Sequence, residues 1–363
     1  MEGACTLTIL KQNSKFLTAL PVQVIEVPGG VVLKRGATEI LVNGAHAAEV
    51  VKSVLNLTGN GASVARILGR FSPSDRQKIQ ELINHLIERH MLVSADTKMR
   101  TPRLEERDVD IFFSNFGSAN TGVVTDISKL RFVIIGVNTI SRQLALCLAT
   151  CGFQNYLVLD DLQHRSPRFF NKMGDLNGQE WPASLERPRL WDTNRPLEFG
   201  DCTVVTSDAG GQQYFCELNK LCLEHKVKLL PVMLKNFIGH VGPFVIPGET
   251  ACYQCLVSRE GSHRTDPLID SIVDTAAVSG NAVGFHPSMA AILGDVAAFE
   301  LTRFFTGNLP QRAPGQFLEI DLLAGKMVNR TVIKVPRCTA CGSLQKSSLI
   351  NLRKLLFSRN GSK

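Results

Sequence analysis

Four cysteines in the carboxyl-terminal part of the chain stand in two C-x-x-C pairs, Cys252 with Cys255 and Cys338 with Cys341. Each pair can offer two thiolates to one ion, and two such pairs are typical of a tetrahedral four-cysteine zinc site. Disulfides and a chance arrangement are the alternatives, and a reducing compartment disfavours disulfides. We predict a structural zinc ion, because four thiolates leave no coordination position open for a substrate.

A second candidate for chemistry is the stretch from Arg131 to Asp161, which has the order of a nucleotide-binding βαβ unit. A short apolar strand ends at Gly136, a helix with apolar residues at helical spacing follows, and a second apolar strand ends at Asp160 and Asp161. In such a unit, an acid after the second strand can bind a ribose hydroxyl. The glycine fingerprint is incomplete, with Asn138 in place of one glycine.

The elements that would position these residues alternate between strands and helices. We predict a strand at Cys202–Val205, a helix from Gln212 to Lys226, a strand at Lys228–Met233 and a small-residue helix over 286–307. This alternation favours an α/β fold with a Rossmann-like, doubly wound and mostly parallel sheet. The segment 162–200 departs from the pattern, because it contains several prolines and little helical periodicity.

The first part of the chain has a separate pattern of short strands and turns followed by three helices with apolar stripes. We expect Ser72 to cap the third helix, with Pro73 in its first turn. A hairpin followed by three small helices forms a winged-helix-like α+β unit. The predicted domains are residues 1–95 for this unit, 96–128 for a polar linker, 129–345 for the α/β domain and 346–363 for a tail.

Length and composition describe an ordinary globular protein. The 363 residues are 44% hydrophobic and 20% charged, with a formal net charge of +7, which excludes a disordered chain and allows two domains. The positive charge suits either a solvated basic surface or attraction to an acidic ligand such as a nucleotide phosphate. No run reaches transmembrane length and no secretory signal is present, so we expect a cytoplasmic protein that does not bind membranes.

Taken together, these features resemble the adenylating superfamily of ThiF, MoeB and the ubiquitin-activating enzymes. The resemblance covers roughly Lys129 to Gly342 and rests on the βαβ unit, the T-S-D at 206–208 and the two cysteine pairs. The phrase GHVGPFVIPGETACYQC is most similar to the branch that modifies ribosomal peptides. That branch includes the microcin C adenylating enzyme and ThiF-like proteins paired with azoline-forming cyclodehydratases.

The resemblance implies that ATP and Mg²⁺ bind beside the strand ends, that the zinc is structural, and that the chain forms a homodimer. ATP would lie against Gly136, Val137 and Asn138. The other implied contacts are Asp160 or Asp161 to the ribose, Asp208 to Mg²⁺, and Arg165, Arg168, Asn171 and Lys172 as candidates for the phosphates. A hard cation prefers oxygen ligands, and cationic side chains would neutralise the charge that develops on the attacked phosphate.

Residues 1–95 resemble the peptide-recognition element of enzymes that mature ribosomal peptides, which is similar to the small peptide chaperone of pyrroloquinoline quinone biosynthesis. The shared features are the hairpin, the helix that ends near LNLTGNGASVARIL and the closing helix up to HMLV. The resemblance implies that the leader of a precursor peptide adds a strand to the hairpin edge and touches the third helix. A DNA-binding winged helix is the alternative, and the mixed charge of the third helix argues against nucleic acid.

The implied function is ATP-dependent activation of a peptide carboxylate, by adenylation or phosphorylation, followed by condensation or dehydration within a precursor peptide in antibiotic biosynthesis. Because Asn138 and Ser141 replace glycines near the phosphate path, a non-catalytic scaffold that delivers the peptide to a separate cyclodehydratase is the alternative. A nicotinamide oxidoreductase is a third hypothesis, which a four-cysteine zinc site does not explain. His286 and the stretch near Ser279 could line the substrate pocket, although His286 before Pro287 also suits a helix start.

Overall fold

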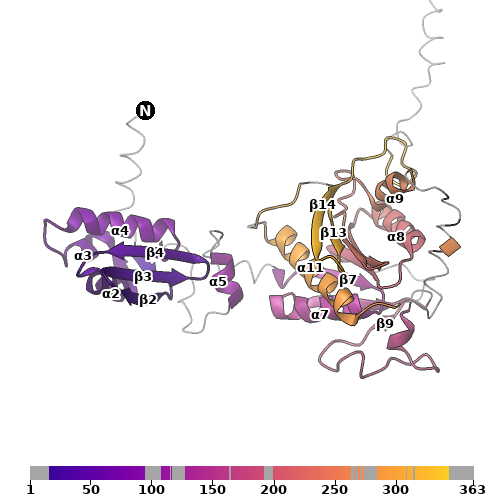
Figure 1. The fold of residues 1–363 in the computed structure, drawn as a ribbon, viewed down its shortest axis with the longest axis horizontal. Helices are drawn as coiled ribbons and strands as arrows, with labels where there is room; N and C mark the ends of the chain where they lie inside the picture. The colour runs from indigo at the N-terminus through magenta and orange to yellow at the C-terminus, as the bar shows by residue number, and fades with distance from the viewer. Residues whose placement is uncertain are drawn as a thin grey trace, which may run out of the picture. The chain divides into compact units, whose positions relative to one another are not determined.

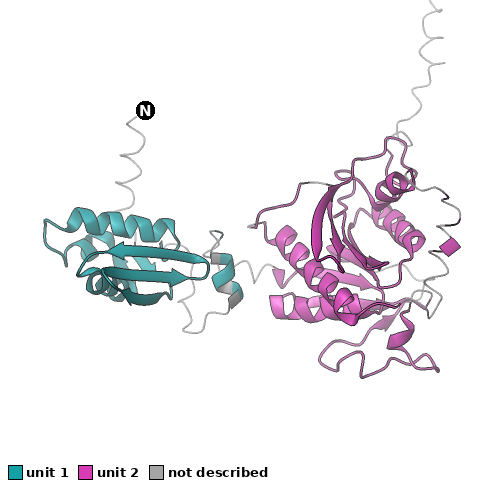
Figure 2. Cartoon of the chain, viewed as in Figure 1, with its two compact units in different colours: residues 1–125 teal, residues 126–363 magenta. Residues whose placement is uncertain are grey.

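The computed structural model describes residues 16–94, 108–114, 116, 127–162, 165–191, 199–262, 266, 269, 272–273, 284–307, 309–313 and 315–342. These residues fall into two compact units, unit 1 within residues 1–125 and unit 2 within residues 126–363 (Figure 2). The predicted tail and most of the predicted linker lie outside the described residues, and the linker segment includes a short helix, α5 (Asp108–Ser114). None of the described helices is long and apolar enough to span a bilayer.

Unit 1 packs two small sheets against three helices, α2, α3 and α4 (Figure 1). The strands are β2 (Gln23–Val27), β3 (Gly30–Arg35) and β4 (Thr38–Asn43) in one antiparallel sheet, and β5 (Ala62–Ser63), β1 (Phe16–Ala19) and β6 (Leu92–Ser94) in the other. The helices are α2 (Ala47–Thr58), α3 (Val64–Leu68) and α4 (Arg76–Glu88). Val31 and Leu33, two residues apart on β3, share one buried cluster with Val51, Ile67 and Ile83 of the helices. The alternation of side chains along β3 therefore places one of its faces in the core.

The start of α4 differs from the prediction. Its first residue is Arg76, preceded by Asp75, and the Ser72 hydroxyl donates a hydrogen bond to Asp75 Oδ2 at 2.6 Å. The Asp75 N–H also donates to the Ser72 carbonyl at 3.0 Å. The prediction that Ser72 caps the helix is wrong, because Ser72 closes a turn that precedes the helix.

Unit 2 is built on one eight-stranded sheet with the order β14-β13-β12-β11-β10-β7-β8-β9. The strands are β7 (Arg131–Ile135), β8 (Asn155–Asp160), β9 (Arg189–Leu190), β10 (Cys202–Ser207), β11 (Lys228–Lys235), β12 (Ile238–Val241), β13 (Gln316–Asp321) and β14 (Lys326–Thr331). The five strands from β11 to β9 are parallel, and β12, β13 and β14 continue the sheet in antiparallel order. The prediction of a mostly parallel α/β sheet is confirmed.

Helices cover both faces of this sheet. On one face, α7 (Thr139–Cys151) and α11 (Pro287–Thr306) pack against the sheet and form one buried apolar cluster with it. On the other face, α8 (Gln212–Glu224) and α9 (Tyr253–Gly261) form a second buried cluster. On β7, Phe132 and Ile134 belong to the first cluster, and Val133 and Ile135 belong to the second. A strand buried on both faces needs the continuous apolar run that the sequence has here. The doubly wound arrangement is therefore confirmed. In the segment 162–200, the structure describes a short 3-10 helix, Pro167–Phe169, and strand β9.

Helices α7 and α11 pack against each other closely at Gly294. A Cβ atom at this position would lie 2.7 Å from the Ile140 carbonyl oxygen and 2.9 Å from the Leu144 nitrogen. Both atoms belong to the α7 backbone, which cannot rotate away as a side chain could. Gly294 therefore fixes the distance between the two helices that cover one face of the sheet.

Replacing Gly294 by alanine is expected to lower the free energy of unfolding by about 2 kcal/mol, because the two helix backbones must separate. Gly261→Ala is the matched control, since a Cβ there meets no atom within 4 Å and alanine is intrinsically favoured in a helix by about 1 kcal/mol. Urea unfolding of both variants measures the difference. Equal stabilisation by the two substitutions would contradict the close approach at Gly294.

Candidate metal centre and strand-end site

The four predicted zinc ligands lie together in unit 2. Cys252 precedes α9, Cys255 is in its first turn, and Cys338 and Cys341 follow β14. The Sγ–Sγ distances are 3.8 Å for Cys252 and Cys255, 3.7 Å for Cys252 and Cys338, and 3.5 Å for Cys255 and Cys341. Four sulfurs at about 2.3 Å from a tetrahedral zinc ion are separated by about 3.8 Å. The cluster could therefore hold zinc without large movements, and the sulfurs are too far apart for the alternative of disulfides.

The electrostatic surroundings of the cluster favour a thiolate. Cys255 Sγ accepts a hydrogen bond from the Cys252 thiol and another from the Val335 N–H at 3.4 Å, and these bonds lower the pKa of Cys255 to about 4. A deprotonated sulfur is the form that binds a metal ion. Three of the four cysteines are buried, so the charge would need a bound cation to compensate it.

The predicted nucleotide residues lie at the carboxyl ends of the parallel strands. Gly136, which follows β7, has a φ of +108°, and a Cβ there would lie 2.5 Å from the Thr206 carbonyl oxygen of β10. Only glycine fits both the backbone conformation and this approach. The turn after β7 is therefore held tightly against the end of β10, on the side where open α/β sheets bind ligands.

Asn138 and Ser141 form a capping box at the amino end of α7. The Asn138 N–H donates to Ser141 Oγ at 3.0 Å, and the Ser141 N–H donates to Asn138 Oδ1 at 3.0 Å. The Asn138 side chain also donates to the carbonyl and hydroxyl oxygens of Thr206 at 3.0 and 2.9 Å. Asn138 and Ser141, which replace glycines, thus have a structural role. Their side-chain oxygens accept hydrogen bonds from backbone N–H groups that the amino end of a helix can otherwise donate to a phosphate.

Asp208 completes this end of the helix. Its carboxylate is buried and accepts the Thr139 N–H at 3.3 Å. Burial raises the pKa of Asp208, while the Thr139 N–H, the charge of Arg168 and the Ser166 hydroxyl oppose the shift. The structure therefore places Asp208 at the amino end of α7, within reach of the charge of Arg168.

The two acids after β8 have different partners. Asp160 makes a two-bond ion pair with Arg165, with Nε–Oδ1 at 2.8 Å and Nη2–Oδ2 at 2.6 Å, and the Arg165 guanidinium lies 4.1 Å from the centre of the Phe170 ring. Asp161 accepts a hydrogen bond from the Tyr214 hydroxyl of α8 at 2.6 Å. Burial and the neighbouring Asp161 raise the pKa of Tyr214, so this hydroxyl keeps its proton and remains a donor.

The other residues predicted to bind the phosphates do not gather around the buried acids. Arg168 donates to Glu180 at 3.1 Å and is partly exposed. Lys172 and Asn171 are exposed in the turn that follows. Among the described residues, no hydrogen bond or ion pair joins Lys172 to Asp160, Asp161 or Asp208. His286 begins α11 as its N-cap, with Nδ1 accepting the Ser288 N–H at 3.3 Å and Pro287 in the first turn, whereas Ser279 lies outside the described residues.

The sequence interpretation missed several members of this site. They are Thr139, Ser166, Glu180, Thr206 and Tyr214, each of which bonds to, or acts on the charge of, a predicted residue. Tyr214 is 53 positions from Asp161, and no local pattern marks such a pair. Thr206 is the first residue of the T-S-D motif at 206–208, and this motif was the one sequence feature that could have identified Thr206 as part of the site.

Comparison with known proteins identifies the fold of unit 2. Residues 215–342 match the model of the ThiF family. The search of curated proteins found no match. The ThiF-like resemblance is confirmed over these residues, which are about a third of the chain and contain all four clustered cysteines.

Solved structures extend the likeness to both units. E. coli MccB with ATP is 16% identical, with 90% of this chain and 100% of that chain covered at a TM-score of 0.63. The microcin C7 biosynthetic enzyme MccB with N-formylated MccA is 15% identical, with the same coverage and a TM-score of 0.63. A heterocyclase in complex with substrate and cofactor is 16% identical, with 91% of this chain and 40% of that chain covered at a TM-score of 0.56. At these identities the likeness shows a shared fold.

Proposed function

We propose that this chain takes part in the ATP-dependent maturation of a ribosomally made precursor peptide. Unit 1 binds the leader of the peptide, and unit 2 activates a carboxylate of the peptide. The observation that carries the proposal is the shared order of both units: 90% of this chain aligns with MccB, whose structures contain the peptide MccA or ATP. We also propose, more specifically, that the chain is similar to the enzyme that builds the bicyclic core of pantocin A, which the fusion of a peptide-recognition domain to a ThiF-like domain fits.

Unit 1 offers an open sheet edge for the leader. The order β2-β3-β4 leaves β2 and β4 at the edges, and α2 packs against β2, with Lys52 paired to Glu26. β4 alternates between half-buried and exposed residues. Ile25, Val32 and Leu41 are cross-strand neighbours and form an apolar row on the outer face. A peptide that pairs with β4 would extend this row by one side chain.

Replacing Leu41 by aspartate is expected to weaken leader binding about tenfold, because a contact of roughly 1.5 kcal/mol is lost and a charge is placed beside apolar side chains. Leu41 is 57% exposed, so the fold should tolerate the change. Leu323→Asp is the matched control, since Leu323 is 70% exposed in unit 2. Fluorescence anisotropy with the labelled peptide encoded beside this gene measures both affinities. Equal affinities would reject β4 as the binding edge.

Unit 2 has residues that fit ATP and Mg²⁺ at the strand ends. The buried Asp208 carboxylate would supply an oxygen ligand to Mg²⁺, Asp160 or Asp161 would hold the ribose, and Arg165 and Arg168 would supply positive charge. Gly136, Val137 and Asn138 would lie against the nucleotide. When bound, Mg-ATP supplies a phosphoryl or adenylyl group that makes the peptide carboxylate reactive. The ribose would replace Arg165 on Asp160, which would release this arginine toward the phosphates.

One experiment tests the activity. The pure protein is incubated with Mg-ATP and its precursor peptide, and the nucleotide products and the peptide mass are followed. AMP or phosphate release with a change in peptide mass is the expected result. Unchanged nucleotide and peptide, with peptide binding demonstrated separately, would exclude the enzyme.

The capping box favours a second candidate, a non-catalytic scaffold that presents the leader to a separate cyclodehydratase. The N–H groups of Asn138, Thr139 and Ser141 already donate to protein oxygens, and Asp160 is neutralised by Arg165. A nucleotide would have to displace these bonds. If the scaffold is correct, the protein binds leader peptide but shows no ATP-dependent heat of binding in titration calorimetry, and it stimulates a cyclodehydratase added in trans.

A further inference from the structure

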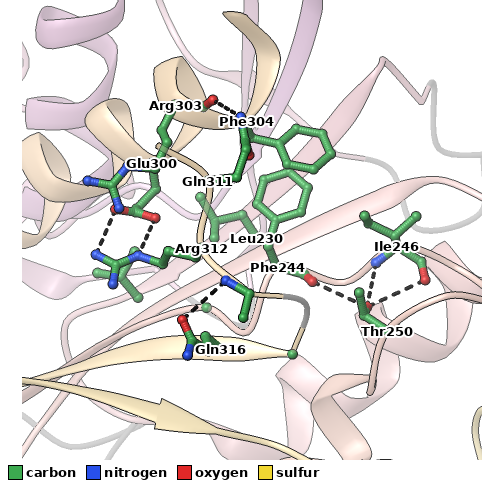
Figure 3. Close-up of a pocket in the computed structure, with 14 residues that line it drawn as sticks. Leu230, Phe244, Ile246, Thr250, Glu300, Arg303, Phe304, Gln311, Arg312 and Gln316 are labelled. Atoms are coloured by element: carbon green, nitrogen blue, oxygen red, sulfur yellow. Dashed lines mark hydrogen bonds and ion pairs between the residues drawn. The ribbon is translucent and has the colours of Figure 1, made fainter. Parts of the chain in front are cut away.

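A cavity of about 290 Å³ lies in unit 2 (Figure 3). Leu230, near the amino end of β11, lines it, together with Phe304 near the end of α11. Asp160 and Asp208 lie at the carboxyl ends of β8 and β10, which run parallel to β11. The cavity is therefore at the opposite end of the sheet from the candidate nucleotide residues.

One part of the cavity is apolar and aromatic. Phe244 and Phe304 are stacked with their ring centres 4.0 Å apart and an angle of 21° between the rings. Leu230, Val241 and Ile246 also line the cavity. Its volume is near the lower end of the range for ligand pockets, about 300–1,000 Å³. The space suits one compact apolar group, such as a benzene ring, more than an extended molecule.

The other part of the cavity carries excess positive charge. Glu300 makes a two-bond ion pair with Arg312, with Nε–Oε2 at 2.7 Å and Nη2–Oε1 at 2.9 Å, so this pair is close to neutral. Arg303 makes a longer contact with Glu300, 3.3 Å from Nη1 to Oε1, and its guanidinium carbon lies 5.0 Å from the centre of the Phe299 ring. Among the described residues, the buried Nε of Arg303 has no hydrogen-bond partner. Among the residues that line the cavity, two guanidinium groups thus share the single carboxylate of Glu300, which leaves positive charge in excess.

Figure 3 shows how these groups are arranged. The Glu300–Arg312 pair lies on one side of the two phenylalanine rings, with Arg303 above it, and Thr250 lies on the other side. Buried guanidinium donors bind carboxylates through strong charge-assisted hydrogen bonds. An apolar slot beside an incompletely paired arginine is a recognition site for a group that is aromatic at one end and carboxylate at the other.

We propose that this cavity binds an arylalkyl carboxylate, either a free acid or the carboxyl end of a peptide that terminates in an aromatic residue. Arg303 binds the carboxylate, and the ring lies against Phe244 and Phe304. This site does not depend on the proposed function, because it lies at the other end of the sheet and needs neither nucleotide nor leader peptide.

The test uses the full-length protein and 4-fluorophenylacetate as a fluorine NMR probe, with 4-fluorophenylacetamide as the uncharged partner. We expect a Kd of about 1 mM for the acid and an affinity at least about tenfold lower for the amide, because a charge-assisted hydrogen bond is lost. Saturating ATP should leave the affinity unchanged. Equal affinities for acid and amide, or no binding of the acid at about 10 mM, would overturn the proposal.

Variants then locate the site. Ala313→Trp places a large side chain at an exposed lining position and should abolish binding, whereas Ala324→Trp, in the exposed turn between β13 and β14, should leave it unchanged. Arg303→Gln should remove the preference for acid over amide, and Arg303→Lys should restore part of it. Wild-type affinity in Ala313→Trp would refute the assignment, and circular dichroism verifies that each variant is folded.

A competition experiment distinguishes the two sources of the carboxylate. Gly-Gly-Phe and Gly-Gly-Phe-amide are added to the bound probe. If Gly-Gly-Phe displaces the probe and its amide does not, the carboxyl ends of peptides are ligands, and the proposed site is supported. Displacement by phenylacetate but not by Gly-Gly-Phe identifies a free acid and also supports it. Displacement by the tripeptide amide as strongly as by the acid would contradict recognition of the carboxylate by Arg303.

Discussion

Replacing Cys252 by serine is expected to remove the zinc ion and unfold unit 2, while unit 1 stays folded. The four sulfurs connect the start of α9 to the segment after β14, which are 86 positions apart in the chain. Structural zinc contributes on the order of 10 kcal/mol in small domains, and whole domains are stable by only about 5–15 kcal/mol. Without the ion, the remaining buried thiols would have to be protonated or exposed, and the two segments would lose their connection.

Cys216→Ser is the matched control for this substitution. Cys216 is also buried and belongs to the same apolar cluster on the α8 and α9 face of the sheet, but it is not one of the four clustered sulfurs. We expect it to lower the free energy of unfolding by about 1 kcal/mol and to leave the metal bound.

Three measurements decide the outcome. Elemental analysis should find about one zinc ion per wild-type chain and none in Cys252→Ser. Thermal unfolding by circular dichroism should lose the transition of unit 2, and hydrogen exchange should remain slow in residues 16–94. A wild-type protein that is purified without zinc, or a Cys252→Ser variant that unfolds at the wild-type temperature, would refute the metal centre.

Features that depend on short stretches of sequence could be predicted. The cluster of four cysteines follows from two C-x-x-C pairs, since each pair brings two sulfurs together within one turn of chain. The buried strand β7 follows from a continuous apolar run, which only a strand covered on both faces needs. His286 before Pro287 similarly marked the first turn of α11. In each case, the residues that carry the signal stand close together in the sequence, even where the cysteine pairs themselves meet across 86 positions.

Features that depend on distant residues could not be predicted. Tyr214 reaches Asp161 from another helix. Asn138 was interpreted as an obstacle to phosphate, whereas the structure shows it bonded to Thr206, 68 positions away. Periodicity contains no information on such contacts, so the chemistry of the site was less predictable than its fold.

Replacing Asp208 by asparagine is expected to reduce Mg-ATP turnover at least about 100-fold without reducing the stability of the protein. Asparagine has nearly the same shape and can still accept the Thr139 N–H, but it lacks the negative charge that a Mg²⁺ ligand requires. Leader binding should be unchanged, because Asp208 belongs to unit 2.

The difference in stability between the wild type and this variant has a predicted pH dependence that does not involve ATP. Burial raises the pKa of Asp208 above its ordinary value of 3.8, so the folded state favours the protonated acid. The stability that this group contributes is therefore present below pH 3.8 and is lost as the pH rises through the pKa of the folded state. Asparagine resembles the protonated acid at every pH, so Asp208→Asn should be at least as stable as the wild type at pH 7, and the difference should disappear near pH 4.

These two measurements on Asp208→Asn separate the candidate functions. If the protein is an enzyme, Asp208→Asn loses turnover, and urea unfolding at pH 7 shows that the variant is at least as stable as the wild type. Such a result indicates that the buried charge of Asp208 destabilises the fold and is needed for the reaction. In a scaffold, the wild type and Asp208→Asn both lack turnover, and only the stability differs. A variant that retains wild-type turnover would reject Asp208 as the magnesium ligand. A variant that is less stable than the wild type at pH 7 would show that the carboxylate is needed to hold the amino end of α7.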